Sequence, residues 1–310
     1  MRIAIMGSGG TGGYFGALLA RAGEDVAFIA RGAHLDSICD NGLTVKTSYA
    51  GDFTIEAKAT DNPAEIGLVD LVLFCVKAYD TAAAAEVIRP MIGSETAVLS
   101  VQNGIDNQER IANIIGPGHV IGATALVSSM IERPGVIAHQ AVPGGMITLG
   151  DLDGRTSRRA EDLLVTFKNA GINAEISSDI QVTLWEKFIG ICGVSGLSTL
   201  TQLPMGPVIA CPETRELFRR TMEEVEAVAR AKGIGLLDGV AEGAIDLMSK
   251  LPPSFRGSMY YDLVAGRRLE LESLNGAAIR LGGEMGIPTP MNFAIYAALK
   301  PYVNGAPEMP

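Results

Sequence analysis

The first residues with a spacing suited to chemistry form a glycine-rich turn, Gly7-Ser8-Gly9-Gly10-Thr11-Gly12. The turn follows an apolar run at residues 2–6 and opens a segment with helical spacing at 14–22. In this context the first glycine permits the tight turn, the second lets a pyrophosphate approach the backbone, and the third allows close packing of helix on strand. A purely structural turn is the alternative, but it would not need so many glycines. We therefore expect a dinucleotide to bind here, on the helix N-terminus.

The residue after the second apolar run, at 26–30, is Arg31. Units that bind NAD usually place Asp or Glu at this point, where the carboxylate binds the ribose 2′-hydroxyl. A guanidinium instead suits a 2′-phosphate, which a carboxylate would repel. The position therefore favours NADPH, the alternative being that Arg31 is an ordinary solvated surface residue.

A single lysine stands at the head of the most apolar helical segment, in Trp185-Glu186-Lys187-Phe188. An ammonium entering such a segment must be solvated, paired or shifted in pKa. It can also be a lysine that buries its stem and keeps its charge in water. Further on, Ser258 and Glu270 lie in a polar stretch that is typical of a solvated helix face. The residues alone leave these interpretations open.

The elements that must position these residues divide the chain near Ser178. Before it, strand-like runs alternate with helical segments. We expect strands at 2–6, 26–30, 68–76, 97–101, 120–127, 136–139, 146–149 and 174–176, a hairpin within 44–57, and helices at 14–22, 78–88 and 156–169. After it, helical periodicity covers 181–201, 212–232, 238–250 and 273–285, and strand-like runs disappear. The predicted fold is α/β, with a Rossmann-type NADPH-binding domain at 1–178 and an all-α domain at 179–310, to which the family resemblance described below assigns the substrate and catalytic residues.

Composition excludes several classes of protein. With 25 basic and 35 acidic residues among 310, the net charge is −10, which does not suit nucleic acid. No apolar run reaches the ~18 to 20 residues of a membrane span. The four cysteines form no Cys-x-x-Cys pair and the three histidines lack ligand spacing, so we expect reduced thiols, a cytoplasmic location and no metal. The oligomeric state stays open, a homodimer included.

The order of these parts resembles the ketopantoate reductase (2-dehydropantoate 2-reductase) family over nearly the whole chain. In the first half the resemblance is carried by the turn at 7–12, Arg31, Val76-Lys77-Ala78 and Gln102-Asn103-Gly104. In the second half it is carried by Trp185-Glu186-Lys187, Ser258-Met259, Asp262, Glu270 and Asn275.

The resemblance implies an NADPH-dependent reduction of 2-dehydropantoate to pantoate, a step of pantothenate biosynthesis. Lys187 matches the family's lysine that donates a proton to the carbonyl oxygen, where an ammonium also stabilises the developing alkoxide. Glu270 matches the glutamate beside that lysine and the substrate's hydroxyl group. Lys77 and Asn103 match residues that line the nicotinamide and substrate cleft, and Ser258 matches a serine that holds the substrate carboxylate.

Three positions depart from the family's pattern. Asparagines commonly lie four and eight residues after the catalytic lysine, and here those positions are Ile191 and Ser195. Phe255 stands where the family often has another asparagine, three residues before Ser258. Each lost hydrogen bond to a polar substrate can cost ~1 kcal/mol. The substrate pocket is thus predicted to be more apolar, with Ser195 as a remaining polar contact.

Three functions follow from these observations. The first is reduction of ketopantoate, and the second is oxidation or reduction of a less polar 2-keto acid, or of a 3-hydroxy or sugar acid, on the same fold. The third is a non-catalytic NADPH-binding sensor. Lys187 and Glu270 argue against the sensor, because a sensor has little use for a proton donor.

Overall fold

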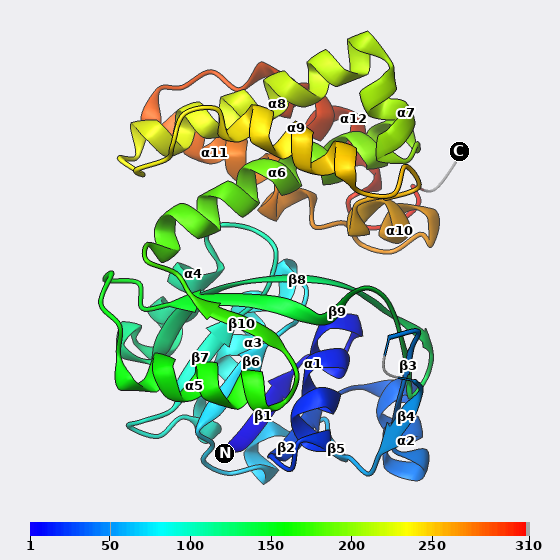
Figure 1. Ribbon diagram of the computed structural model, residues 1–310, viewed down its shortest axis with the longest axis vertical. Coiled ribbons are helices and arrows are strands. Elements are labelled where there is room, and N and C mark those ends of the chain that lie inside the picture. Colours follow the sequence, from blue (N-terminus) through cyan, green and yellow to red (C-terminus); the bar gives the residue numbers. More distant parts are fainter. Residues whose placement is uncertain (50, 308–310) are drawn as a thin grey trace. The chain divides into compact units, whose positions relative to one another are not determined.

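A computed structural model of the protein describes residues 1–49 and 51–307. Contacts divide the chain into two compact units. The first comprises Met1–Gln102 and Asn107–Ile180, and the second comprises Asn103–Asp106 and Gln181–Pro310. Within the described residues the strands all belong to the first unit, and the second is helical (Figure 1). The predicted fold class, a Rossmann-type α/β domain followed by an all-α domain, is confirmed.

The first unit is built on a sheet in which neighbouring strands follow the order β4-β3-β9-β8-β7-β6-β1-β2-β5, with β10 paired to β9. The strands are β1 (Arg2–Met6), β2 (Asp25–Ile29), β3 (Leu43–Thr47), β4 (Phe53–Ile55), β5 (Lys58–Thr60), β6 (Leu71–Phe74), β7 (Ala97–Ser100), β8 (Val120–Arg133), β9 (Val136–Gly150) and β10 (Asn173–Ile176). Strand β1 lies between β2 and β6 and is parallel to both. Their side chains are buried on both faces, which explains the near-continuous apolar runs.

Five α-helices accompany this sheet: α1 (Gly10–Arg21), α2 (Gly32–Asn41), α3 (Thr81–Val87), α4 (Asn107–Ile115) and α5 (Arg158–Asn169). Short 3-10 helices η1 (Pro63–Glu65), η2 (Ala78–Asp80), η3 (Arg89–Met91) and η4 (Pro117–His119) join them to the strands. Helix α1 places Phe15 and Leu19, both fully buried, into the core. The sequence patterns did not predict α2, which buries only Ile38 and so lacks a clear apolar stripe.

The three short strands predicted within 120–149 do lie in strands, but the structure extends the first to residue 133 and joins the other two into one strand. Strands β8 and β9 are 14 and 15 residues long and pair with each other antiparallel (Figure 1). Register shifts interrupt this pairing, so the alternation of apolar and polar residues loses its period of two. On β8, Leu126, Met130 and Ile131 are exposed, so the strand continues beyond the part that covers the core.

The second unit consists of helices α6 (Ile180–Thr201), α7 (Met205–Ala210), α8 (Pro212–Ala231), α9 (Val240–Lys250), α10 (Ser258–Val264), α11 (Asn275–Met285) and α12 (Pro290–Leu299), with 3-10 helices η5 (Leu271–Ser273) and η6 (Lys300–Tyr302). Helix α6 is apolar around most of its circumference because other helices of the unit surround it. Its residues Phe188, Cys192 and Leu197 are at most 1% exposed.

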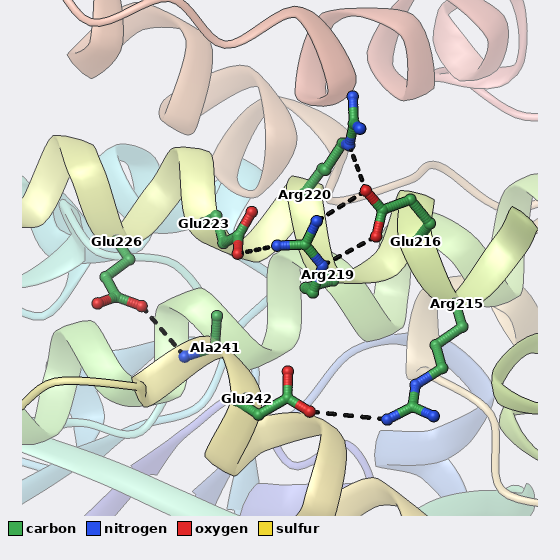
Figure 2. A network of polar contacts seen from close by, with 8 residues as sticks. All are labelled: Arg215, Glu216, Arg219, Arg220, Glu223, Glu226, Ala241 and Glu242. Carbon is green, nitrogen blue, oxygen red and sulfur yellow. Dashed lines mark hydrogen bonds and ion pairs between the residues drawn. The ribbon is translucent and has the colours of Figure 1, made fainter. Parts of the chain in front are cut away.

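Charged side chains join α8 to α9 (Figure 2). Within α8, Nη2 of Arg219 lies 2.7 Å from Oε1 of Glu216, and between the two helices Nη2 of Arg215 lies 3.6 Å from Oε1 of Glu242. Further along α8, Oε2 of Glu226 accepts a hydrogen bond from the backbone N–H of Ala241 at 3.1 Å. Ala241 is in the first turn of α9, whose N-cap is Gly239 and therefore has no side chain to accept this bond. Glu226 thus caps a helix from a neighbouring one.

Two kinds of feature are absent from the described residues, a helix that could span a membrane and a cluster of metal ligands. Over residues 1–49 and 51–307, no helix is both long and apolar enough to cross a membrane. Over the same residues, no three His, Cys, Asp or Glu side chains are grouped so that they could hold a metal ion.

Candidate cofactor and catalytic sites

The glycine-rich turn lies at the carboxyl end of β1, where Gly9 is the N-cap of α1. Gly9 forms no side-chain cap, so the N–H groups of the first helical turn are left for another partner. Because β2 and β6 run parallel to β1 on either side, the turn lies at the edge of the sheet where ligands of doubly wound folds bind.

Two glycines of this turn have opposite surroundings. A Cβ added to Gly12 would collide with the carbonyl oxygen of Gly7 and would lie 3.0 Å from Cβ of Cys75. A Cβ added to Gly9 would meet no protein atom within 4 Å. The fold itself therefore requires glycine at position 12. At position 9 the open space fits the close approach of a pyrophosphate to the backbone.

Ser8 is 3% exposed and fixes the turn to β2. Its backbone N–H and its Oγ both donate to the carbonyl oxygen of Ile29, at 3.2 and 3.0 Å. Gly10 contacts the backbone of Ser129 so closely that a Cβ there would collide with it. Thr11, in the first turn of α1, is half-buried. The polar atoms that the turn leaves for a ligand are thus mainly backbone N–H groups.

Arg31 and Lys77 follow two strands of the same sheet. Arg31 is exposed and is the N-cap of α2, two residues after β2 ends. Lys77 is half-buried and is the N-cap of η2, shortly after β6. Because β1, β2 and β6 are parallel, both residues leave the sheet at the edge that carries the glycine-rich turn. The exposed guanidinium of Arg31 is available to an anion there.

Lys187 of α6 and Glu270, just before η5, are two charged residues of the second unit whose charges affect each other. Lys187 is half-buried, and Glu270 is 4% exposed. Burial lowers the pKa of Lys187 and the negative charge of Glu270 raises it by less, so the resulting pKa is about 8, below the ordinary 10.5. Trp185 and Phe188 pack edge to face beside the lysine along α6, with ring centroids 5.7 Å apart. The arrangement yields an ammonium that can release its proton near neutral pH.

The turn that precedes α10 packs against α6 at Ser195 and Ser198. A Cβ added to Gly257 would lie 2.9 Å from Cα of Ser195, and the N–H of Gly257 donates to Oγ of Ser198 at 3.1 Å. Ser258, the next residue, is exposed and opens α10. Ser195 is fully buried, and its Oγ has no hydrogen-bond partner among the described residues.

Asn103 groups with the helical unit, although it follows a strand of the first unit. The short segment Asn103–Asp106 is held there by an ion pair, with Oδ2 of Asp106 2.8 Å from Nη2 of Arg280 in α11. Ile105 also packs against the core of the helical unit. Sequence patterns did not predict this grouping, since nothing in residues 103–106 marks a distant partner.

Comparison with known proteins identifies the family to which the chain belongs. The family model for ketopantoate reductase PanE/ApbA matches residues 3–154, and the model for its C-terminal part matches residues 179–303. The chain belongs to the ketopantoate reductase family. A 2-dehydropantoate 2-reductase of Mesorhizobium japonicum is 31% identical to it over 97% of each chain.

Solved structures agree with this membership. A ketopantoate reductase family protein of Ralstonia eutropha is 34% identical with a TM-score of 0.90, and covers 97% of this chain and 98% of its own. A 2-dehydropantoate 2-reductase of Geobacter metallireducens is also 34% identical, with a TM-score of 0.91 and coverage of 97% and 99%. The predicted family and the predicted class, an oxidoreductase, are confirmed.

At two positions where the family resemblance leads us to expect asparagines, the chain has apolar side chains. Ile191, one turn along α6 from Lys187, is half-buried and packs against the helical core. Phe255 is also half-buried and packs against the same core. The two side chains cannot form the hydrogen bonds that amides at these positions would form.

A buried amide pair was not predicted from the sequence. Asn275 is fully buried, and its Nδ2 donates to Oδ1 of Asn292 at 2.9 Å. Asn292 in turn donates to Oε2 of Glu224 at 2.8 Å, and Glu224 accepts from the backbone N–H groups that open α12. This series of hydrogen bonds joins α8, α11 and α12. The Asn275 that carries part of the family resemblance is therefore part of a hydrogen-bond network in the helical core.

Proposed function

We propose that this protein reduces ketopantoate, with hydride from NADPH and a proton from Lys187. The observation that carries the proposal is the half-buried Lys187, whose pKa lies near 8 beside the buried Glu270. A donor whose pKa is close to the working pH transfers its proton efficiently. In its charged form the same group stabilises the alkoxide that develops as the carbonyl is reduced.

Each predicted residue has a distinct part in this reaction. NADPH, when bound, supplies the hydride. The N–H groups of the turn at 7–12 hold its pyrophosphate, and Arg31 holds its 2′-phosphate. The Ser258 hydroxyl holds the substrate carboxylate, and Lys187 protonates the carbonyl oxygen. Glu270 keeps Lys187 charged and accepts a hydrogen bond from the substrate's hydroxyl group. We assign Lys77 and Asn103 to the surroundings of the nicotinamide and the substrate, and Ser195 to the substrate.

The second candidate is a less polar 2-keto acid as the substrate. It is favoured by Ile191 and Phe255, which replace amides by apolar side chains on the surface that we assign to the substrate. A site that leaves polar substrate groups without partners loses ~1 to 3 kcal/mol for each one. An apolar side chain of the substrate would instead be stabilised by contact with Ile191 and Phe255.

The test is NADPH oxidation by purified protein, with ketopantoate and with a panel of 2-keto acids of graded side-chain polarity. We expect turnover with ketopantoate, and Lys187→Ala should abolish it without preventing NADPH binding. Faster turnover of the apolar acids would select the second candidate. Tight NADPH binding without turnover of any acid would contradict both candidates and support a sensor.

The preference for NADPH has its own test in Arg31→Ala. The lost charge-assisted hydrogen bonds should weaken NADPH binding by roughly tenfold or more, because such bonds contribute ~1.5 to 3 kcal/mol. NADH, which has no 2′-phosphate, should bind the variant and the wild type alike. Equal losses for the two cofactors would contradict the role of Arg31. Since Arg31 is exposed, the variant should fold normally.

A further inference from the structure

His34, in the first turn of α2, connects the glycine-rich turn to the turn between β8 and β9. Its Nε2 lies 2.8 Å from the carbonyl oxygen of Ser8. Its Nδ1 lies 3.1 Å from the backbone nitrogen of Gly135, whose N–H donates to it. The histidine is half-buried, and both ring nitrogens are engaged by backbone groups far apart in the sequence.

These two contacts fix the tautomer of the ring. A backbone N–H can only donate, so Nδ1 of His34 must be the acceptor for Gly135. In a neutral imidazole the other nitrogen then carries the proton, and Nε2–H donates to the carbonyl oxygen of Ser8. Each partner is thus matched to one nitrogen, and the ring cannot be flipped without losing both bonds.

The contact with Ser8 determines the direction of the next peptide group. In a trans peptide the carbonyl and the following N–H point in opposite directions. Because His34 holds the Ser8 carbonyl, the N–H of Gly9 must point away from the histidine. Ser8 is fixed on its other side by two hydrogen bonds to Ile29. The Ser8–Gly9 peptide is therefore held at its carbonyl oxygen by His34, while Ser8 itself is fixed to Ile29, and this peptide leads into the glycine whose Cβ position is open space.

The other end of this connection is also anchored. The carbonyl oxygen of Gly135 accepts from the backbone N–H of Thr44 at 2.9 Å, and the carbonyl oxygen of Pro134 accepts from Oγ of Ser37 at 3.1 Å. Ser37 is in α2, one turn after His34. The turn between β8 and β9 is thus held in place by hydrogen bonds, and His34 links this turn to the carbonyl oxygen of Ser8.

We propose that His34 is a positioning residue for the cofactor, because it holds the Ser8–Gly9 peptide with the Gly9 N–H directed at the pyrophosphate. This inference rests on the proposed function, in which the turn binds NADPH. The pyrophosphate is common to NADPH and NADH. Loss of the histidine should therefore weaken the binding of both cofactors by the same factor, unlike loss of Arg31.

Two substitutions of His34 by amide residues distinguish the contribution of its contact with Ser8 from that of its contact with Gly135. In His34→Gln the side-chain amide nitrogen can take the place of Nε2 and donate to Ser8, but the acceptor for Gly135 is lost. In His34→Asn the side-chain oxygen can take the place of Nδ1 and accept from Gly135, but the donor to Ser8 is lost. The dissociation constants of both cofactors are measured by nicotinamide fluorescence, together with kcat and KM for each cofactor.

We expect His34→Asn to raise the dissociation constants of NADPH and NADH about fivefold, the effect of one net hydrogen bond. His34→Gln should stay within about twofold of wild type, and kcat should change in neither variant, because His34 does not touch the reacting atoms. Equal losses in the two variants, or a larger loss in His34→Gln, would overturn the proposal. A wild-type protein that binds neither cofactor would instead overturn the proposed function. A thermal unfolding midpoint for each variant identifies any loss that comes from misfolding.

Discussion

The negative charge of Glu270 raises the pKa of Lys187 and burial lowers it, and the pKa that results from both effects is about 8. The two effects oppose each other, and burial is the larger. On an exposed helix face the pKa of Lys187 would change much less, because water would solvate the ammonium and screen the charge of Glu270. The position of Lys187 on α6, with Glu270 brought beside it from a later segment, therefore determines the protonation state available at neutral pH.

The first prediction concerns the pH dependence of keto acid reduction. The reaction needs protonated Lys187, so kcat/KM should be level below a pH of about 8 and fall about tenfold per pH unit above it. Glu270→Gln removes the charge that raises the pKa. The falling limb should then move to lower pH, whatever activity remains. The measurement is kcat/KM for the keto acid in wild type and variant across this range. A limb at the same pH in both would show that Glu270 does not act on Lys187 by charge.

The second prediction concerns stability. The pKa of Lys187 in the folded protein, about 8, is below its ordinary value of 10.5. The folded state therefore binds this proton less well, so its stability is higher above pH 10.5 and decreases as the pH falls toward 8. At neutral pH the protonated lysine costs up to ~3 kcal/mol. The double variant Lys187→Met/Glu270→Gln, which leaves no unpaired charge, should be inactive but should unfold at a higher urea concentration than wild type. A lower midpoint would contradict this account.

The third prediction compares two glycines of the same turn. Gly9→Ala places its Cβ in open space, so the variant should fold as stably as wild type. It should nevertheless lose most of its affinity for NADPH, because the new methyl group occupies the place of the pyrophosphate. Gly12→Ala forces a collision with the carbonyl oxygen of Gly7 and should lower the unfolding midpoint as well. Urea unfolding and cofactor titration are measured in parallel. Unchanged NADPH affinity in Gly9→Ala would exclude this turn as the phosphate site.

The fourth prediction uses two glutamates of α8. The carboxylate of Glu226, with its side chain 14% exposed, accepts the N–H of Ala241 and pairs with Arg230. Glu226→Ala should lower the free energy of unfolding by ~1 to 2 kcal/mol, as expected for loss of a helix cap. Glu216 is 42% exposed, and among the described residues its ion pairs are with side chains of its own helix, so Glu216→Ala should cost less than ~1 kcal/mol. Similar losses in both variants, by urea unfolding, would argue against the capping role.

Sequence patterns predicted the parts of the fold that depend on local chemistry. The apolar run before Gly7 and the glycines after it specify a strand, a turn and a helix within one short stretch. In the same way, the position of Arg31 after the second strand follows from spacing alone. The family resemblance added Lys187 and Glu270, which the residues by themselves left as a snorkelling lysine and a solvated helix face.

What could not be predicted depends on partners that are distant in the sequence. His34 lacks any local signal, because its partners are backbone groups of Ser8 and Gly135, and a backbone group leaves no mark on the sequence. The lengths of strands β8 and β9 could not be predicted, because their irregular register breaks the alternation of apolar and polar residues. Similarly, the burial of Asn275 depends on Asn292, which lies in a helix that the patterns did not predict.

The segment Asn103–Asp106 makes the helical unit discontinuous in the chain. These four residues are synthesised well before Gln181, and the ion pair of Asp106 can form only after Arg280 has also been synthesised. A fragment that begins at residue 181 lacks them altogether. We therefore expect the helices expressed alone to lack Asn103 and to leave Arg280 without this acidic partner, so a cut in the linear sequence does not separate the two structural units.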